Sequence, residues 1–535
     1  MFSIRQYGYE GKQGSRIEGG EYGYQDAKGA TDHDLRDMDR IGKKQELRRR
    51  FKATHIVGFG SLLGAAWPYM LITGVFSLSN GGPAGSVIAF LVTAFILIMS
   101  NFSLAEAASI APTSGGQYHW VSEFAPPSMQ RYLSYVVGWL CTLGWQVGLA
   151  SVCYASALQI QALIAVHDET YALPGWQAAL IAIAFNAGAI FFNTVLVKHL
   201  PIFEASMLVV FALGFVAYVV VFWALSPLNS ASYVFTSIQD NNGWGNAGLA
   251  VLIGILSPIS SLTSADSSCH LAEELKDASR VLPRAMIATQ AVNFGAAFIM
   301  LISLLFALYD IDDALASPTG VPYIAVLLNS TGSKAATTGL VFIIILMLFC
   351  CAVNLVTTSS RQAFAFARDN GLPFSKYLAH VQPGMDIPLN AVLLTFGFTL
   401  AISLILFGSA VAFNIICSLG AAAILTSYVV VHACMLYRDF TSPLPPARFS
   451  LGKWRYIVRP IALAGVLLVD VMVFFPSAPN PTPETMNWVS LIFGFVVIAS
   501  TVFYHLRGKK VYNGPVRDVK CEIVMDDVSP RRTSY

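Results

Sequence analysis

Charged residues are scarce in this chain of 535 residues: Asp, Glu, Lys and Arg together make up 12% of it, whereas hydrophobic residues make up 55%. In a soluble domain about a quarter of the residues are charged. So small a share excludes a water-facing surface for a chain of this length, and lipid is the expected solvent. Nucleic-acid binding is excluded as well, because the basic residues stand at the ends of apolar segments rather than on one folded face.

Motifs for disulfide or metal chemistry are also missing. The eight cysteines form neither a disulfide framework nor a CxxC motif, and all but Cys521 fall in or at the ends of apolar runs, where a thiol acts as a small apolar group. The nine histidines are scattered and include no HExxH pattern. We therefore expect no metal, no cofactor and no intramembrane enzyme. No apolar stretch lies close to the N-terminus, so we expect no cleavable signal peptide.

Long apolar runs, in contrast, are abundant. A membrane-spanning helix needs about 20 mostly apolar residues, and twelve runs of this kind follow one another along the chain. They are His55–Leu78, Val87–Ala108, Leu133–Ala165, Ala178–Val197, Phe203–Leu225, Gly248–Ser268, Ala285–Leu308, Gly339–Thr358, Ala391–Phe407, Val411–Cys434, Ile457–Phe475 and Trp488–Tyr504. The sequence therefore predicts an all-α polytopic membrane protein with twelve transmembrane helices.

Lys and Arg are distributed unevenly between the loops that join these runs. If the N-terminus is on the inner side, Lys334 is the only basic residue in the predicted outer loops. Short cytoplasmic loops carry the excess of Lys and Arg, so both termini are expected in the cytosol. The triplet that starts at Asn329 is a glycosylation sequon in an outer loop, which makes Asn329 a candidate glycosylation site. The tails, residues 1–50 and 508–535, lack apolar periodicity, and we expect both to be disordered.

Two of the runs contain an unusual number of helix-breaking residues. The first has Gly58, Gly60, Ser61, Gly64 and Pro68, and the sixth has Gly254, Pro258, Ser260, Ser261, Thr263, Ser264 and Asp266. Pro removes a backbone donor, and Gly lowers the cost of leaving helical geometry. In lipid, a broken helix is tolerated only where protein or a water-filled cavity satisfies the freed backbone groups.

The positions of these two runs suggest how the helices are arranged. They are five runs apart, an odd offset, which gives two five-helix units of opposite orientation. Secondary transporters often have this plan, with the solute held between two discontinuous helices. We therefore predict that helices 1 and 6 are discontinuous. The alternative is that Gly and Pro are simply common in membrane helices.

Four segments of the chain carry motifs of a known family. They are Ser103–Trp120 (SLAEAASIAPTSGGQYHW), Leu200–Glu204 followed by Gly214-Phe215, His270–Arg284 (HLAEELKDASRVLPR) and Arg361–Pro373 (RQAFAFARDNGLP). Together they resemble the amino acid–polyamine–organocation (APC) superfamily, and in particular its fungal amino acid/choline permeases, which include GABA and choline transporters. The motifs occur in the family's order, and the likeness covers roughly residues 51–507.

This resemblance implies a 5+5 inverted-repeat (LeuT-like) fold. Repeat one would cover about 54–226, repeat two about 247–437, and two extra helices about 457–505. The resemblance also implies secondary active transport by alternating access, as symport with protons, of a small amino acid, GABA, choline or a related amine. The expected partners are the solute, the proton and the lipid bilayer, in the plasma membrane or alternatively the vacuolar membrane. The alternative function is a nutrient-sensing receptor on the same scaffold, whose mark would be a long structured tail.

Candidate solute-binding residues lie in and around the two breaks. They are Gly60, Ser61, Gly64 and Trp67 in the first run, Trp145 and Gln146 in the third, Ser257, Ser260, Ser261, Thr263 and Asp266 in the sixth, and Asn354 in the eighth. Bare N–H groups of a half-helix attract a carboxylate, whereas aromatic faces and a carboxylate attract a cation. Each residue also has a structural interpretation, such as close helix packing, a hydroxyl bonded to its own helix, or an ion pair.

Three carboxylates near the inner ends of the runs are candidates for coupling or gating, namely Glu106, Glu204 and Glu273. A desolvated carboxyl group can hold a proton near neutral pH, and so could carry a transported proton. For Glu106 and Glu204 the alternative, which we favour, is a salt bridge that closes the inner gate. Glu273 belongs to a charged inner loop, where it either contacts the gate or is simply solvated.

Overall fold

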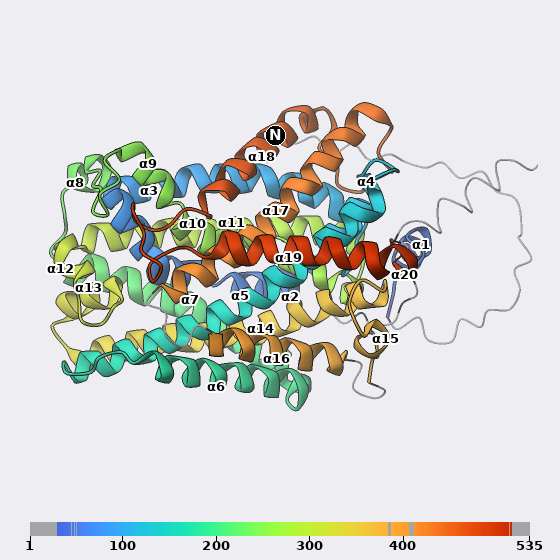
Figure 1. Ribbon diagram of the computed structural model, residues 1–535. Coiled ribbons are helices and arrows are strands. Elements are labelled where there is room, and N and C mark those ends of the chain that lie inside the picture. Colours follow the sequence, from blue (N-terminus) through green and yellow to red (C-terminus); the bar gives the residue numbers. More distant parts are fainter. Residues whose placement is uncertain are drawn as a thin grey trace, which may run out of the picture.

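The structure, a computed structural model, describes residues 29–515 except Lys44, Glu46, Arg48, Arg50, 383–386, 406–410 and Asn513. Most of both predicted tails, residues 1–28 and 516–535, therefore lies outside the described residues. In the part of the chain that is described, long helices lie side by side in one bundle (Figure 1). Helices α8, α12 and α13 lie at one end of the bundle, and α1, α15 and α20 lie at the other.

The helices that the apolar runs predict are mostly long, although α9 and α10 have seven residues each. They are α2 (Ala53–Gly64), α3 (Ala66–Ile110), α5 (Gln130–His167), α6 (Gly175–Thr194), α7 (Leu200–Leu225), α9 (Ala247–Ile253), α10 (Leu256–Leu262), α11 (Ala278–Ala307), α14 (Lys334–Arg368), α16 (Leu389–Ile405), α17 (Ala412–Thr441), α18 (Arg455–Met472) and α19 (Val489–Phe503). Shorter helices connect them: α1 (Asp32–Arg40), α4 (Gln117–Phe124), α8 (Ala231–Thr236), η2 (Ser267–Glu274), α12 (Ile311–Leu315), α13 (Pro322–Thr331), α15 (Ser375–Leu378) and α20 (Lys509–Val511).

Nine helical stretches within the described residues are long and apolar enough to cross a membrane. One of them, Ala53–Ile110, has 58 residues. At 1.5 Å per residue it would measure roughly 90 Å if straight, about three times the hydrocarbon thickness of a bilayer. It is therefore too long to be a single crossing. It is interrupted at Ala65 and again at Gly82, whose φ is 63°.

The bundle has a packed interior and an apolar outer surface. Helix α5 packs between α14 and α17, and α3 packs against α10 and α11. Large apolar side chains on the outer helices stay exposed, among them Leu213 on α7 and Phe495 on α19. Exposed apolar surface of this extent marks contact with something other than water, which agrees with an integral membrane protein.

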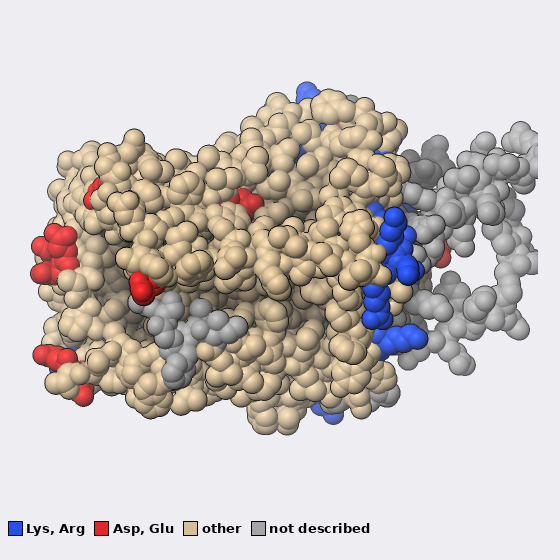
Figure 2. All heavy atoms as spheres, viewed as in Figure 1, with Lys and Arg blue, Asp and Glu red and all other residues tan. Residues whose placement is uncertain are grey.

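The two ends of the bundle differ in charge. Figure 2 shows Lys and Arg gathered at the end where α1, α15 and α20 lie, and Asp and Glu at the opposite end. Lys509 and Lys510 of α20 belong to the basic end, and Asp312 and Asp313 of α12 lie at the acidic end. The uneven loop charge seen in the sequence therefore becomes a separation along the bundle axis.

Part of each tail is folded, so the prediction of disorder over residues 1–50 and 508–535 does not hold for the described part. Helix α1 begins in a capping box formed by Thr31 and Asp34, and Met38, one turn after Asp34 on the same face, is buried. Near the C-terminus, Tyr512 is fully buried and its hydroxyl lies 2.6 Å from Ser134 Oγ. The order of these polar segments depends on partners elsewhere in the chain. They therefore need no apolar periodicity of their own, and the sequence pattern does not reveal them.

Candidate functional site

The first break separates α2 from α3. Ala65 between them has left-handed backbone angles, φ 38° and ψ 41°, which an L-residue adopts only at a cost. Its N–H donates to the Ser61 carbonyl, and its own carbonyl accepts from the Tyr69 N–H at 2.9 Å. Pro68 is the third residue of α3, where an N–H has no partner within the helix, so Pro is tolerated there. The break therefore comes directly after Gly64, in the run where the sequence predicts it.

The second break follows α10. Helix α10 ends at Leu262, residues 263–266 are not helical, and η2 begins at Ser267 as a tighter 3₁₀ helix. The Thr263 N–H still reaches the Ile259 carbonyl at 3.0 Å, but the Ser264 N–H turns to Leu262. The end of a helix leaves carbonyl groups without intrahelical partners, so this break exposes backbone acceptors in the interior of the bundle.

The two breaks lie against each other. A Cβ added to Gly64 would lie 2.7 Å from Ser264 Oγ and 2.4 Å from Asn293 Nδ2 of α11. One turn earlier, a Cβ on Gly60 would lie 2.8 Å from Thr289 Cγ2. A larger residue at either position would force these side chains to move, which explains the small residues at this end of α2.

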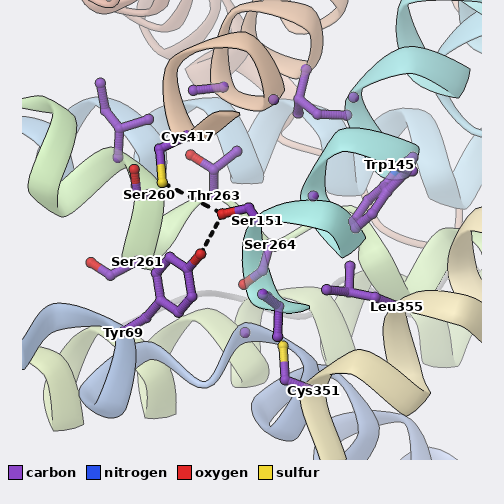
Figure 3. A pocket seen from close by; sticks show the side chains of 18 of the residues that line it. Tyr69, Trp145, Ser151, Ser260, Ser261, Thr263, Ser264, Cys351, Leu355 and Cys417 are labelled. Atoms are coloured by element: carbon purple, nitrogen blue, oxygen red, sulfur yellow. Dashed lines mark hydrogen bonds between the residues drawn. The ribbon is translucent and has the colours of Figure 1, made fainter. Parts of the chain in front are cut away.

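A cavity of about 100 Å³ lies beside the two breaks (Figure 3). Helices α3, α5, α14 and α17 complete its wall, and its lining includes Leu63, Gly64, Tyr69, Gly144, Trp145, Gly148, Ser151, Ile259, Ser260, Ser261, Thr263, Ser264, Cys351, Leu355, Cys417 and Gly420. Pockets for drug-sized ligands have volumes of about 300 Å³ or more. The volume of this cavity therefore suits only a small solute.

The cavity wall is mostly apolar, with several hydroxyl and thiol groups, and carries no charged side chain among the described residues. The hydroxyls of Tyr69 and Ser151 form a hydrogen bond, and Ser151 Oγ lies 3.4 Å from Cys417 Sγ (Figure 3). Cys351 Sγ donates to the Leu63 carbonyl at 2.8 Å, near the end of α2. These contacts connect the first break to the walls that α5, α14 and α17 form.

Three polar groups that line the cavity have no hydrogen-bond partner within the described residues. They are Ser260 Oγ, Thr263 Oγ1 and Trp145 Nε1, and all three are buried. Buried polar atoms are hydrogen-bonded in the large majority of cases. A solute in the cavity could supply the missing partners.

The structure brings some of the predicted solute-binding residues together at this cavity. Gly64, Trp145, Ser260, Ser261 and Thr263 all line it. Whether they bind a solute stays a prediction. Their shared position supports the pairing of the two breaks that their spacing suggested.

Other predicted solute-binding residues point elsewhere. Trp67 is fully buried against α7, with its ring centroid 5.3 Å from that of Tyr218. Gln146 Nε2 donates to Thr395 Oγ1 of α16 at 3.0 Å. These side chains pack helices together outside the cavity wall.

The remaining predicted residues are buried near the breaks without lining the cavity. Ser257 lies against Thr73, with 3.4 Å between the hydroxyl oxygens. Ser61 supplies the carbonyl that ends α2. Asn354 on α14 is fully buried, and neither polar atom of its side chain has a partner within the described residues.

Asp266 also lies outside the lining, in a fully buried polar cluster. Its carboxylate accepts hydrogen bonds from the Tyr428 hydroxyl of α17 and from Gln117 Nε2 of α4. His270, one turn along η2, lies 4.0 Å away. Asp266 therefore does not contact the cavity in this conformation.

Ion pairs join segments at the basic end of the bundle. Glu273, at the end of η2, pairs with both terminal nitrogens of Arg368 on α14, at 2.7 and 2.9 Å. The next residue, Glu274, accepts from Arg361 Nε at 3.0 Å. Of the three carboxylates predicted for gating, Glu273 is the one placed between the second break and this end.

Asp369, just past the end of α14, extends this network. It pairs with Lys43 and accepts from the Tyr118 hydroxyl at 2.9 Å. Burial raises the pKa of its carboxyl, but the charges of Lys43 and Arg368 outweigh burial and hold the pKa below its usual range. The group is therefore ionised at physiological pH.

Glu106 and Glu204 have different surroundings. Glu106, buried near the end of α3, pairs with Arg459 of α18 at 2.6 Å and accepts from Ser450 Oγ at 2.6 Å. Glu204 on α7 lines a second cavity, of about 300 Å³, together with His55 and Arg361. Among the described residues Glu204 takes part in no ion pair. Glu106 thus anchors α18, whereas Glu204 faces open space.

The segment before α2 covers the basic end. The Phe51 N–H donates to the Glu274 carbonyl at 3.1 Å, and the Lys276 N–H donates to the Phe51 carbonyl at 3.2 Å. Upstream, Asp34 accepts from the backbone of Asp277 and Ala278, each at 3.0 Å. The N-terminal segment is thus fastened to the loop between η2 and α11.

Asp34 is ionised in this contact. Burial raises its pKa, but hydrogen bonds from Thr31 and Ala278 and the charge of Arg49 outweigh burial and hold the pKa below its usual range. Arg49 Nη1 lies 3.2 Å from Asp34 Oδ1, and both side chains are almost fully buried. Helix α1 is therefore held by a buried charge with several donors.

The candidate glycosylation site, Asn329, is exposed in the last turns of α13. The Thr331 hydroxyl of the same sequon donates to the Leu327 carbonyl at 2.9 Å. Glycosylation of Asn329 stays a prediction.

Several residues of the cavity wall are not predicted by the sequence. Cys351 and Cys417 have the pattern of small apolar groups, and Ser151 belongs to no predicted site. A signal for Ser151 was present, because Gly144, Gly148 and Ser151 repeat at helical spacing on one face of α5. For the two cysteines, no pattern in the sequence distinguishes them from the other buried thiols.

Comparison with known proteins agrees with this architecture. Residues 51–498 match the model of a family described as amino acid permeases. An uncharacterized amino-acid permease of Schizosaccharomyces pombe is 32% identical over 489 residues, which cover 90% of this chain and 88% of that protein.

Two relatives of Saccharomyces cerevisiae have named substrates. A choline transporter is 29% identical, with 90% of this chain and 86% of that protein covered. A GABA-specific permease is also 29% identical, with 94% of this chain and 89% of that protein covered. All of these relatives are named as permeases or transporters rather than as enzymes. The chain therefore belongs to the amino acid permease family.

Proposed function

We propose that this protein is a secondary active transporter that moves a small amino acid or amine by alternating access. The observation that carries the proposal is the cavity of about 100 Å³ beside two helix breaks that contact each other at Gly64 and Ser264. In secondary transporters, discontinuous helices hold the solute near the middle of the bilayer. The choline and GABA transporters among the relatives support this class of solute.

The proposed topology has twelve crossings in a 5+5 inverted repeat. The 58-residue stretch provides two crossings if the chain reverses at Gly82, and α16 and α18 add two to the other eight apolar stretches. Because cytoplasmic loops carry the excess of Lys and Arg, the basic end in Figure 2 faces the cytosol, with both termini. We propose the plasma membrane as the location.

The cavity wall suggests how the solute is oriented. The N–H groups of Ala66 and Trp67, at the start of α3, have no partner within that helix, and a helix N-terminus attracts a carboxylate. The carbonyls at the end of α10 attract an ammonium group. Because no side chain of the lining is charged, a solute with no net charge, such as a zwitterion, fits better than a polyamine.

The ion pairs at the basic end support the alternating-access part of the proposal. Glu273 and Arg368 join η2 to α14, and Lys43 joins the N-terminal segment to Asp369. These contacts connect segments that would have to separate for solute to leave toward the cytosol. We infer that they form the inner gate, and that protons supply the driving force.

An uptake assay in permease-deficient cells tests the proposal. Labelled GABA, choline, putrescine and alanine are offered separately, with and without a proton uncoupler, and surface protein is quantified in parallel. We expect accumulation of at least one zwitterionic or singly charged solute, and loss of accumulation with the uncoupler. Normal surface expression with no uptake of any of the four would refute this substrate class.

A nutrient-sensing receptor on the same scaffold is the second candidate. The observation that favours it is the folded N-terminal segment, whose Asp34 binds the loop after η2. A receptor would bind one of these solutes without net uptake. Binding would change how strongly the α1 amides are protected against hydrogen exchange. The two functions are separated when binding and uptake are measured on the same cells.

A further inference from the structure

A buried carboxylate directly before η2 and a buried imidazole four residues later, within η2, lie on the inner side of the second break. Asp266 and His270 are both 0% exposed, and Asp266 Oδ2 lies 4.0 Å from His270 Nε2. Ser264, which lines the solute cavity, is two residues before Asp266. The pair is thus next to the cavity but does not contact its contents.

One hydrogen bond of His270 fixes which ring nitrogen carries a hydrogen in the neutral state. Its Nδ1 lies 2.9 Å from the carbonyl oxygen of Ser114. A carbonyl can only accept, so Nδ1 carries a hydrogen in every charge state. Nε2 therefore either presents a lone pair toward the Asp266 carboxylate or carries a second proton. Within the described residues Nε2 has no hydrogen-bond partner.

These two states differ by one proton and one unit of charge. Without that proton, the Asp266 carboxylate faces a lone pair and the pair has a net charge of minus one. With it, the pair is neutral overall, either as an ion pair or as a carboxylic acid beside a neutral imidazole. A net charge buried away from water is costly, so the closed arrangement favours the pair that holds the proton.

The surroundings supply few other charges. Tyr428 of α17 and Gln117 of α4 donate to the carboxylate. The other titratable groups that face the pair are Cys141 of α5 and Cys269 of η2. Among the described residues, no Lys or Arg forms an ion pair with Asp266, unlike Glu273 one turn beyond His270. A proton is therefore a partner that can balance the charge of Asp266.

We propose that Asp266 and His270 together form the binding site for the proton that drives transport. This inference rests on the proposed transport function. One proton from the outer side binds to the pair, and the same proton leaves to the cytosol once the inner gate opens. Only the bond between this proton and the imidazole nitrogen or the carboxylate oxygen forms and breaks.

The position of the pair explains how proton release can open the gate. Segment η2 leads directly from Asp266 to Glu273, whose ion pair with Arg368 closes the basic end. The loop before α4 packs tightly on η2, since a Cβ on Gly116 would lie 2.8 Å from Cys269 Sγ and 3.2 Å from His270 Cε1. Loss of the proton leaves a net negative charge on the buried pair. Water can reach this charge only if η2 moves away from the loop before α4.

Proton-coupled uptake by reconstituted protein tests the proposal. The variants are Asp266→Asn and His270→Gln, each close in size to the original side chain and unable to titrate. The probe is whichever of GABA, choline or alanine the wild type transports, and a pH-sensitive dye inside the vesicles records proton entry. We expect at least a ten-fold loss of solute-evoked proton entry and of accumulation. Exchange of labelled for unlabelled solute should persist, because it needs no net proton movement.

His432→Gln is the matched control. His432 is also buried, but within the described residues its ring nitrogens bond to the hydroxyls of Ser100 and Ser103 rather than to a carboxylate. We expect this variant to keep its proton entry. Exchange activity shows that each variant is folded, and Asp266→Glu, which keeps a titratable carboxyl group, should recover part of the coupling.

The possible outcomes separate the two proposals. If the wild type transports none of the probes, the transport function itself fails. If the wild type is proton-coupled and both variants stay coupled, or if Glu204→Gln alone abolishes the coupling, the proton site is not this pair. Variants that have lost exchange as well as coupling, with no recovery in Asp266→Glu, also contradict the proposal, since the pair would then be structural.

Discussion

Gly64 and Ser264 contact each other at the point where both of their helices are interrupted. A Cβ on Gly64 would lie 2.7 Å from Ser264 Oγ, closer than real Cβ atoms come to a neighbour. These residues are distant in the sequence, yet together they form one edge of the solute cavity. The contact joins the two halves of the chain at the proposed transport site.

Gly64→Leu is expected to abolish uptake while surface protein is retained. The added side chain would overlap Ser264 and Asn293 and enter the cavity. Gly295→Leu on α11 is the matched control, because a Cβ there meets nothing within 4 Å. Uptake by both variants and surface biotinylation provide the measurement, and normal uptake by Gly64→Leu would show that the cavity is not the transport site.

Ser260→Ala and Thr263→Val are expected to weaken apparent affinity. Each removes a hydroxyl that has no partner among the described residues and that a solute would satisfy. A buried hydrogen bond contributes about 1 kcal/mol, so KM should rise roughly five-fold for each variant. Ser206→Ala on the exposed side of α7 is the control. An unchanged KM in both cavity variants would contradict solute contact with this wall.

The two thiols of the cavity give a test that requires no hydroxyl contact. Small thiol reagents are expected to inhibit uptake by reacting with Cys351 or Cys417, and the transported solute should protect both. The double variant Cys351→Ala/Cys417→Ala should be resistant. Cys434→Ala, which removes a buried thiol outside the lining, should stay sensitive. Inhibition that persists in the double variant would show that the reagent acts elsewhere.

Breaking the pair between Glu273 and Arg368 is expected to damage the inner gate. Replacing either partner alone by Gln leaves a buried charge with only its more distant partners, Asp369 for Arg368 and Lys43 for Glu273, which costs up to about 3–5 kcal/mol. The double variant should be more stable than either single variant. Thermal unfolding of purified protein measures this, with Lys334→Gln as control, because its pair with Glu169 is 4.0 Å apart and exposed. Additive losses in the double variant would mean that the two charges do not interact.

Docking of α1 is expected to be constant from about pH 5 to pH 8 and to weaken in acid. The pKa values of Asp34 and Asp369 are both lowered in the folded protein. Their stabilising contribution is therefore fully present above the unfolded-state pKa, about 3.9, and is lost as pH falls through the lower folded-state values.

Hydrogen exchange of the α1 amides measures this docking. Asp34→Asn should raise the exchange rate from about pH 5 to pH 8, because the hydrogen bonds from Asp277 and Ala278 lose their charged acceptor, and the difference from wild type should shrink in acid. Asp32→Asn, at an exposed position of the same helix, is the control. Equal protection in both variants would show that the buried carboxylate does not hold α1.

The sequence by itself determined that this is a helical membrane protein, because apolar runs of spanning length and charges confined to their ends depend only on composition and order along the chain. It also predicted breaks in the first and sixth apolar runs, and those runs leave helical geometry at Ala65 and after Leu262. The family resemblance, which the comparisons confirm, rests on motifs that are contiguous in the chain.

Only the tertiary structure decided which side chains share the cavity. Trp67 and Gln146 face other helices, whereas Ser151, Cys351 and Cys417 converge on the breaks from three separate helices. The same holds for the order of α1, which depends on the backbone of Asp277 and Ala278. Rotation of a helix about its axis and docking of a polar segment are set by contacts between residues far apart in the chain, and no local pattern encodes them.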